Sequence, residues 1–527
     1  TIAIQSKMGY NEFCISFNHI FFTFILFYSR DTLKWQSRFA YGEELYLQKG
    51  IRLFASVLSA AISGMEVCPV QVEADVSSGL PCFTMVGFPS TQVKEAQDRV
   101  RTALKNNGIS LPPKKVTVNL APADLRKEGA GFDLPVAAAV LAASGFIEPQ
   151  LLRNVMVVGE LSLNGEVRSV SGVLPRVIRA RELGCRYCII PFENLAEGAL
   201  VKDMKVVGVQ NIKEVLKLVS DPDAFGKENQ FSEVNSEENQ VEESLVDFGE
   251  ICGQESARRA AEIAVSGFHN ILFIGPPGTG KTMLAKRIPT IMPSLTFEES
   301  LELTKIYSIA GLLSPKRPLI KARPFRSPHH TSSPQALAGG GRIPGPGEIT
   351  LAHRGVLFLD EMPEFSRKSL EILRQPLEDG YVTISRVQAS LTFPANFIMC
   401  TAQNPCPCGY LGDKKRECSC KQFEIERYHR KLSGPLLDRI DLQVYVPRLE
   451  YADLQSREAG ESSAVIRERV IKARQLQLLR LQGTNLYCNA QMGRRELNKH
   501  CQMEAAAEKL LLDGAQVFVL GRSRERG

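Results

Sequence analysis

The sequence predicts an α/β protein with two large domains and a small helical region after them. Three observations support this fold class. In the first part of the chain, short apolar strands alternate with helical stretches; an acidic segment then interrupts this pattern; beyond it, an apolar strand runs directly into a glycine-rich loop and a helix. A length of 527 residues is sufficient for two or three domains that each bury their own core.

The local patterns also place the domain boundaries. In the first domain, residues 53–220, we expect strands over 116–120, 155–159 and 187–190 and helices over 96–106, 134–143 and 175–183. Residues 221–247 are acidic and poor in apolar side chains, so burial cannot offset their ordering entropy and we expect a flexible linker. A second domain follows over residues 248–448. Residues 449–527 turn helical and charged, which indicates a small lid with a helix over 464–481.

Composition excludes several classes of protein. The chain is 44% hydrophobic and 23% charged, which is typical of a globular protein and not of a collagen, a coiled coil or a disordered chain. Thirteen cysteines are an odd number at low density, so we expect a reducing, cytoplasmic location and no disulfide framework. The net charge of +6 permits nucleic-acid binding without requiring it.

The first 52 residues differ from the rest of the chain. Residues 13–28 are apolar but interrupted by Asn18 and His19, and they are shorter than the roughly 20 residues of a membrane-spanning helix. They also lack the basic stretch and the cleavage site of a secretory signal. Three interpretations stay open: a membrane-associating segment, part of the fold, and a non-native or poorly ordered extension over residues 1–52. We favour the extension, because regular patterning begins at residue 53, and we expect no stable membrane partner.

A phosphate-binding motif follows the apolar strand expected over residues 270–274. The motif has the pattern G-x-x-x-x-G-K-[ST] between a strand and a helix, the context in which it binds nucleotides. Its glycines let backbone N–H groups surround the phosphates, Lys281 reaches the β- and γ-phosphates, and Thr282 ligates Mg²⁺. We therefore expect ATP and Mg²⁺ to bind at Gly275, Pro276, Pro277, Gly278, Thr279, Gly280, Lys281 and Thr282.

Two acids follow the next strongly apolar strand, expected over residues 355–359. Acids at the carboxyl end of a parallel strand lie where a phosphate-bound cation is held. We expect Asp360 to hold Mg²⁺ together with Thr282, and Glu361 to polarise the attacking water. Such a pair alone is a weak signal, and it gains strength from the phosphate-binding motif.

Two further polar residues complete the expected catalytic set. A strand over residues 396–399 leads to Asn404, our candidate for the side chain that orients the water beside the γ-phosphate. A simple Asn-Pro turn is the alternative interpretation of Asn404. Arg439 follows a helix-like run, and its guanidinium could stabilise transition-state charge in the site of a neighbouring subunit.

Several cysteines and histidines admit more than one interpretation. Cys406, Cys408, Cys418 and Cys420 form two C-x-C pairs that bracket a short loop, a set that can bind a structural Zn²⁺ through four thiolates. Free cysteines are the alternative, because C-x-C is tighter than the usual spacing. We expect Cys185 and Cys188 to be a buried structural pair and not a redox centre. His329 and His330 have no spaced acidic or cysteine partner, so we expect them to shape a loop or contact a ligand without binding metal.

Taken together, GPPGTGKT at 275–282, GVLFLDE at 355–361 and LLDRIDL at 436–442 resemble the motifs of AAA+ P-loop ATPases. More narrowly, RPFRSPHH at 323–330 and PGEITLAHRG at 346–355 resemble the magnesium-chelatase-like branch, over about residues 53 to 516. The resemblance implies a hexameric ring. It also implies that an insertion among the 79 positions between Lys281 and Asp360 projects toward the pore, and Arg386 lies in a candidate pore hairpin.

The first domain resembles the Lon-protease C-terminal fold, which is ribosomal S5 domain 2-like, over residues 116–131 and 184–194. A protease of that family has a serine where this chain aligns Gly131, and a lysine in the stretch that here contains Arg176. Without a nucleophile and its base, that dyad cannot cleave a peptide bond. We therefore expect no protease activity, and a scaffold for ring assembly or DNA contact.

The resemblance implies an ATP-driven motor on branched or single-stranded DNA, a branch-migration helicase in homologous recombination during natural transformation. The alternative is a magnesium chelatase motor subunit that drives metal insertion into a tetrapyrrole, although the fused first domain argues against it. A non-enzymatic remnant is the third hypothesis. Residues 517–527 do not match the Arg-bearing lid pattern of the family, so we expect the lid to be incomplete and ATP hydrolysis to be slow.

Overall fold

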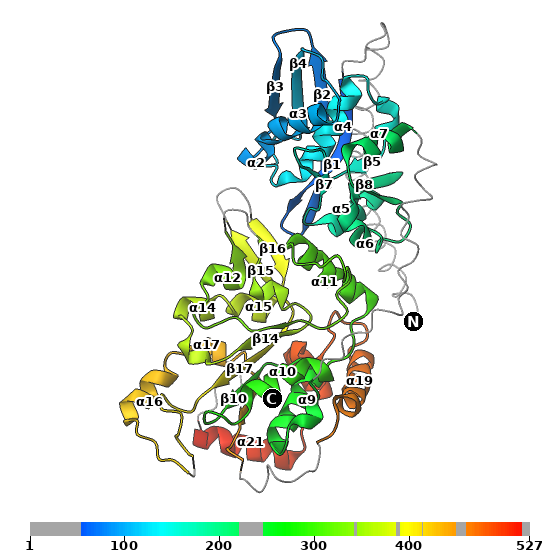
Figure 1. The fold of residues 1–527 in the computed structure, drawn as a ribbon. Coiled ribbons are helices and arrows are strands. Elements are labelled where there is room, and N and C mark those ends of the chain that lie inside the picture. The colour runs from blue at the N-terminus through cyan, green and yellow to red at the C-terminus, as the bar shows by residue number, and fades with distance from the viewer. Residues whose placement is uncertain are drawn as a thin grey trace, which may run out of the picture.

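A computed structural model of the chain describes residues 54–220, 246–341, 345–385, 390–413, 415–449 and 460–518. Four predictions fall wholly or mostly outside these residues: the extension over 1–52, the linker over 221–247 except its last two residues, the role of Arg386, and the character of residues 519–527. The described residues form two α/β regions, one above the other in Figure 1, and a helical part beside the lower region. An α/β fold with a parallel sheet is thus confirmed.

The first region is built on a seven-stranded mixed sheet with the order β3-β4-β2-β1-β5-β8-β9. β2 pairs antiparallel with β1 and β4, and the other neighbouring strands are parallel. The strands are β1 (Phe54–Ser63), β2 (Glu66–Ser77), β3 (Cys82–Val86), β4 (Lys115–Ala121), β5 (Val155–Val157), β8 (Tyr187–Pro191) and β9 (Val206–Val209), with a small hairpin of β6 (Glu160–Leu161) and β7 (Val167–Arg168).

The helices of this region cover the sheet. The helices predicted over 96–106, 134–143 and 175–183 are confirmed within two residues. The second of these is apolar on every side, and it is accordingly buried along its whole length against β1 and β2. The helices are α2 (Thr91–Lys94), α3 (Ala96–Asn106), α4 (Asp133–Ala143), α5 (Val173–Glu182), α6 (Leu195–Gly198) and α7 (Ile212–Ser220).

The second region contains a five-stranded sheet with the order β11-β14-β17-β10-β18, and all neighbouring strands are parallel. Its strands are β10 (Ile271–Ile274), β11 (Phe325–Arg326), β14 (Val356–Leu359), β17 (Ile398–Gln403) and β18 (Leu442–Tyr445). The strand predicted over 396–399 was placed too early. β17 lies between β10 and β14, so pairing on both sides extends it through the buried polar residues Thr401 and Gln403.

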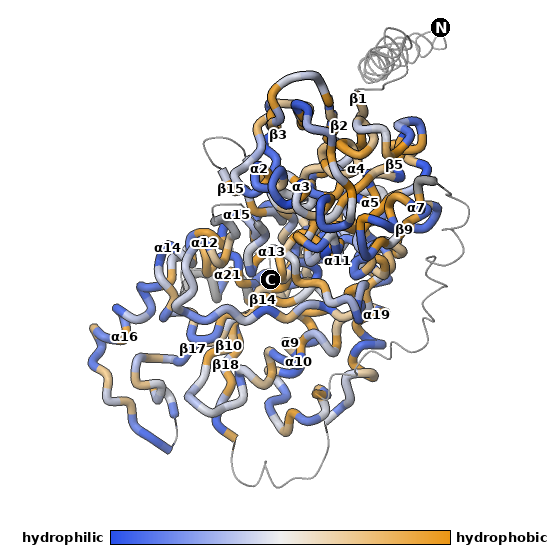
Figure 2. The backbone as a smooth tube through the Cα atoms, turned by 45° about the horizontal axis from the view of Figure 1, so that its top comes forward, coloured by the Kyte–Doolittle hydropathy of each residue, from blue (hydrophilic) through white to orange (hydrophobic). Residues whose placement is uncertain are grey.

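Helices cover both faces of this sheet, and residues between β10 and β14 form the predicted insertion, which supplies the edge strand β11. The helices are α9 (Glu255–Gly267), α10 (Lys281–Ile291), α11 (Phe297–Ile309), α12 (Pro334–Ala338), α13 (Glu348–Leu351), α14 (Arg367–Glu371), α15 (Arg374–Asp379), α16 (Gln422–His429) and α17 (Gly434–Leu437). Two hairpins add β12 (Gly339–Gly340) with β13 (Gly345–Pro346), and β15 (Tyr381–Ser385) with β16 (Ser390–Pro394). Figure 2 shows α16 largely in the blue of hydrophilic residues, whereas β10 and β17 are hydrophobic.

The C-terminal part is helical, as predicted, with α19 (Ser463–Arg480), α20 (Arg494–His500) and α21 (Ala505–Phe518). α19 packs against α9 and α10 of the second region. Among the described residues, no helix combines the length and the apolar character that crossing a membrane requires.

Helix α11 joins the two α/β regions, and in Figure 1 it lies directly below α5 and α6. The backbone N–H of Gly172 donates to the carbonyl oxygen of Ser308 over 2.9 Å, and the Ser308 hydroxyl donates to the buried carboxylate of Glu197. Glu197 also accepts from the backbone N–H of Leu174. The first region is therefore attached to the second through buried hydrogen bonds.

Candidate nucleotide site

The phosphate-binding motif forms the loop between β10 and α10. Gly278 and Gly280 have φ values of 77° and 89°, a backbone conformation that favours glycine. A Cβ atom on Gly275 would lie 2.2 Å from the carbonyl oxygen of Val446, so only glycine fits beside the residue that follows β18. Gly278 and Gly280 therefore allow the loop to turn, and Gly275 allows its first residue to lie against the segment after β18.

Parallel pairing brings the other predicted residues to the same edge. Ile274 is in register with Gln403, and Leu359 with Thr401, so β10, β17 and β14 end side by side. Asp360 directly follows β14, and Asn404 directly follows β17. The predicted residues on three separate strands therefore converge on the phosphate loop.

Lys281 and Thr282 make the contacts that connect the loop to these residues. The Lys281 ammonium donates to the carbonyl oxygens of Gly275 and Pro276 over 2.7 and 2.9 Å, and to Oδ1 of Asn404 over 3.3 Å. The Thr282 hydroxyl donates to Oδ2 of Asp360 over 2.8 Å. Burial lowers the pKa of Lys281, and the nearby carboxylates oppose this shift. The hydroxyl and the carboxylate are hard oxygen donors of the kind that Mg²⁺ prefers.

Glu361 lies at the open side of the loop, with its side chain 56% exposed. Its backbone has a φ of 51°, a left-handed conformation uncommon for a glutamate, at the turn after β14. Nδ1 of His330 lies 3.9 Å from its carboxylate. No acidic residue lies at metal-ligand spacing from His330 in the sequence. The partner is distant in sequence, and the fold brings it close.

Arg439 is not brought to the phosphate loop of its own chain. Its guanidinium donates to Oε1 of Glu378 over 2.6 and 3.1 Å, and its carbonyl oxygen accepts from the side chain of Asn270. Asn270 precedes β10 and therefore lies at the amino end of this strand, whereas the phosphate loop follows its carboxyl end. Arg439 therefore takes no part in the site formed by a single chain.

Sequence reasoning missed Gln254, the residue before α9. Its buried side-chain amide donates to the carbonyl oxygen of Pro447 over 2.7 Å and reaches the carbonyl oxygen of Thr279 at 3.5 Å. It thus connects the start of α9 to the phosphate loop and to the segment after β18. The only signal was a Gly-Gln pair before a helix, which is too common to single out.

The four predicted cysteines come together in the loop between β17 and α16. Their four sulfur atoms all lie within 4.8 Å of one another, and the sulfur of Cys406 is 3.4 Å from that of Cys408 and 3.6 Å from that of Cys418. Tetrahedral bonds of about 2.3 Å would place sulfurs roughly 3.8 Å apart. The backbone N–H of Cys408 also donates to the sulfur of Cys420. The geometry fits a tetrathiolate metal site.

The other singled-out cysteines have a different environment. Cys188 is fully buried, and burial raises its thiol pKa. Cys185 is half-buried, and burial raises its pKa to about 11. Thiols held protonated in this way are poor nucleophiles, which agrees with a structural role.

Gly131 and Arg176 also meet in space. A Cβ atom on Gly131 would lie 3.9 Å from a guanidinium nitrogen of Arg176. That guanidinium donates to the carbonyl oxygens of Ala60, Ser171 and Gly172, and burial lowers its pKa to about 10. Gly131 is therefore adjacent to Arg176, which lies in the stretch where the resemblance implies a lysine, and neither residue is a serine nucleophile or a lysine base.

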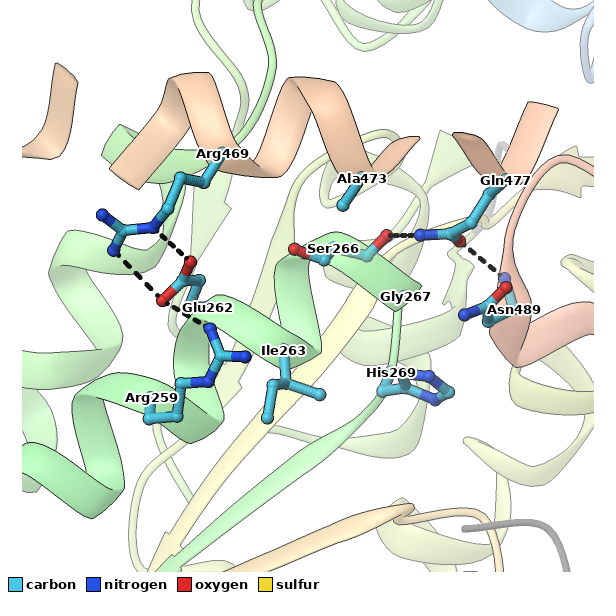
Figure 3. A pocket seen from close by; sticks show the side chains of 10 residues that line it. All are labelled: Arg259, Glu262, Ile263, Ser266, Gly267, His269, Arg469, Ala473, Gln477 and Asn489. Carbon is cyan, nitrogen blue, oxygen red and sulfur yellow. Dashed lines mark hydrogen bonds and ion pairs between the residues drawn. The ribbon is translucent and has the colours of Figure 1, made fainter. Parts of the chain in front are cut away.

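A hollow of about 350 Å³ lies elsewhere, between α9 and α19 (Figure 3). Its charged and polar side chains bind one another: Glu262 accepts from Arg259 and Arg469, and Gln477 donates to the carbonyl oxygen of Ser266. None of its lining residues belongs to the phosphate loop. Among the described residues, most of its polar groups are already paired, although Oδ1 of Asn489 is not, and the hollow lies within the contact between α9 and α19.

Comparison with known proteins agrees with this arrangement. Residues 247–454 match the family described as magnesium chelatase, subunit ChlI, residues 72–194 match subunit ChlI of Mg-chelatase, and residues 460–525 match the C-terminal part of that subunit. The chain is 43% identical to competence protein ComM of Haemophilus influenzae over 85% of this chain and 87% of that protein.

Two further relatives extend the comparison. The chain is 41% identical to the uncharacterized protein YifB of Escherichia coli over 88% of this chain and 89% of that protein. It is 30% identical to the DNA repair protein RadA of Listeria monocytogenes over 33% of this chain and 38% of that protein. The identity to ComM and YifB extends over most of both chains and shows common descent, and the chain belongs to the magnesium-chelatase-like family that includes ComM.

Proposed function

We propose that this protein is an ATP-driven AAA+ motor that acts on DNA, as a branch-migration helicase in recombination during natural transformation. One observation carries the ATPase part: Lys281, Thr282, Asp360 and Asn404 converge by direct contacts at the edge of a parallel sheet. If these four residues only stabilised the fold, they would not require a glycine-rich phosphate-binding loop beside them.

Each residue has a role that follows from its contacts. With ATP bound, Lys281 would donate to the β- and γ-phosphates in place of the loop carbonyls, and Thr282 and Asp360 would hold Mg²⁺. Mg²⁺ supplies positive charge to the phosphates. Asn404 orients the water that attacks the γ-phosphorus, and the exposed Glu361 polarises it, while ADP departs as the leaving group.

The DNA part rests on relatives. ComM is named as a competence protein and RadA as a DNA repair protein, and the net charge of +6 is compatible with a polyanion. The hairpin of β15 and β16 is our candidate for a pore contact, together with Arg386, which follows β15 in the sequence. Assembly into a hexameric ring would allow Arg439 to act in the site of a neighbouring subunit.

We extend the proposal to three further features. The first region serves as a Lon-like scaffold without protease activity, consistent with Gly131 and Arg176 at the dyad positions. The four-cysteine cluster holds a structural Zn²⁺. The location of the protein is the cytoplasm, as its cysteine content favours.

The second candidate is a magnesium chelatase motor subunit, which the descriptions of the matching family models favour. The deciding experiment measures the ATPase rate of the full chain alone, with forked DNA, and with a porphyrin-carrying partner. Strong stimulation by forked DNA supports the DNA motor, and stimulation by the porphyrin partner alone contradicts it. Glu361→Gln, prepared in the same way, is the control, because a rate close to that of the wild type in this variant would come from a contaminant.

A further inference from the structure

The cysteine loop, residues 406–420, lies against the phosphate loop. Gly409 closes a turn in which its N–H donates to the carbonyl oxygen of Cys406 over 2.9 Å. A Cβ atom on Gly409 would lie 2.7 Å from Cδ of Pro277 and 3.8 Å from Cγ of Asn404. The turn that contains Cys406 and Cys408 therefore packs against Pro277 of the phosphate loop and lies near Asn404, the residue that binds Lys281.

The same cysteine loop is connected to the rest of the site from two sides. Asn404, two positions before Cys406, accepts a hydrogen bond from Lys281, and its backbone interacts with the Tyr428 hydroxyl of α16. On the other side, the carboxylate of Asp413 lies 3.2 Å from the guanidinium of Arg448, in the segment that follows β18. That segment also contacts Gly275 and Gln254.

The cysteine loop has little else to hold it in this position. Of the four cysteines, only Cys406 is buried, and the other three are half-exposed. Most residues between Cys408 and Cys420 are exposed, so apolar burial stabilises this loop weakly. Four sulfurs from both of its ends nonetheless gather within 4.8 Å. A bound cation would supply the missing cross-link, because a metal that binds only the folded loop stabilises it.

We infer that the four cysteines form a Zn²⁺-thiolate site that acts as one wall of the nucleotide site, holding Gly409 against Pro277 so that nucleotide affinity depends on the metal. This inference rests on the proposed function, since it assigns a second binding site to the support of the first. Loss of the metal frees the cysteine loop, and Pro277 loses Gly409 as a neighbour.

The test uses the full chain and measures two quantities separately: metal content by elemental analysis, and affinity for a fluorescent ATP analogue. We expect about one zinc per chain. Extraction with a high-affinity zinc chelator should weaken nucleotide binding at least tenfold, and added Zn²⁺ should restore it. Cobalt in place of zinc should give the near-ultraviolet charge-transfer bands of thiolate ligation, a readout independent of nucleotide.

Three variants separate the steps of the inference. Cys408→Ser should lose both zinc and nucleotide affinity, whereas Cys501→Ser, at an exposed cysteine outside the cluster, should keep both. Gly409→Ala should keep zinc, because all four ligands remain, and should bind nucleotide several-fold more weakly, because its methyl group meets Pro277 and because alanine is strained at a φ of 85°. If Cys408→Ser fails to fold, as judged by circular dichroism, chelation of the folded wild type still decides.

The outcomes distinguish this inference from the proposed function. A wild type that binds ATP but contains no zinc overturns the metal site. A chelated protein and a Gly409→Ala variant that both bind ATP normally overturn the coupling. A zinc-loaded wild type that does not bind ATP contradicts the proposed function, and the coupling with it.

Discussion

Lys281 and Arg176 are buried to nearly the same extent, with 8% and 7% of their surfaces exposed, and both donate to backbone carbonyls. Their surroundings differ. Next to Lys281, Cβ atoms on Gly278 and Gly280 would meet nothing within 4 Å, so the phosphate loop borders open space. Beside Arg176, a Cβ atom on Gly131 would meet Val158, Val170 and Arg176 itself. A cation next to open space is available for a ligand, whereas a cation enclosed by its partners supports the fold.

The largest expected effect is the loss of ATP affinity on substitution of Lys281, which tests whether this lysine serves a ligand. Lys281→Ala should weaken ATP binding at least about 100-fold, because the phosphates lose the lysine that faces them. Its melting temperature should fall less than that of an Arg176 variant, because the adjacent Pro277 and Gly278 are exposed and water can reach the carbonyl oxygens that Lys281 leaves. Fluorescent-nucleotide titration and thermal unfolding measure the two effects. A strongly destabilised Lys281→Ala would mean that this lysine supports the fold, as Arg176 does.

Glu361→Gln should separate binding from turnover. The exposed Glu361 does not contact Lys281, so ATP affinity should be preserved, while the ATPase rate falls on the order of 100-fold through loss of the group that polarises water. Single-turnover kinetics with the same nucleotide titration provide both numbers. Comparable losses of affinity and rate would remove this role from Glu361.

Arg176→Met should lower the stability of the protein and leave ATP affinity unchanged, the opposite of Lys281→Ala. Three carbonyl oxygens and the nearby Glu197 would lose a buried cationic partner, which costs about 3 kcal/mol of unfolding free energy. ATP affinity should stay close to that of the wild type. Urea unfolding measures the loss, and Arg181→Met, at an exposed arginine of the same helix, is the matched control. A stable Arg176→Met variant with impaired ATP binding would contradict the comparison.

The smallest expected effect is a pH dependence of ATP affinity. Burial lowers the pKa of the free Lys281, and bound phosphates raise it again, so binding takes up a proton at alkaline pH. ATP affinity should therefore fall as pH rises toward the lowered pKa of Lys281. Lys281→Arg, whose guanidinium stays charged, should show a flatter dependence in titrations between about pH 7 and 9.5. An equally steep fall for both proteins would assign the effect to another group.

Local sequence was sufficient for much of the fold. The helix over residues 96–106 has the predicted bounds, and the strand before the phosphate loop begins one residue late, because both depend on contiguous residues. β17 was displaced, because Thr401 and Gln403 are polar and only pairing on both sides explains why they are strand residues. Gln254 was missed, and the proximity of His330 to Glu361 was not expected, because their partners, Pro447 and Glu361, are remote in sequence.

By itself, the sequence determined the chemistry that is available: a phosphate loop with Lys281 and Thr282, acids after an apolar strand, and four cysteines in two close pairs. These features are encoded within short segments, where spacing alone places side chains together. Only the tertiary structure decided which of them meet. Parallel pairing brought Asp360 to Thr282 and Asn404 to Lys281, and it placed Arg439 near the amino end of β10. The loop after β17 brought Gly409 close to Pro277. Such contacts depend on the order of strands in the sheet, which no local pattern specifies.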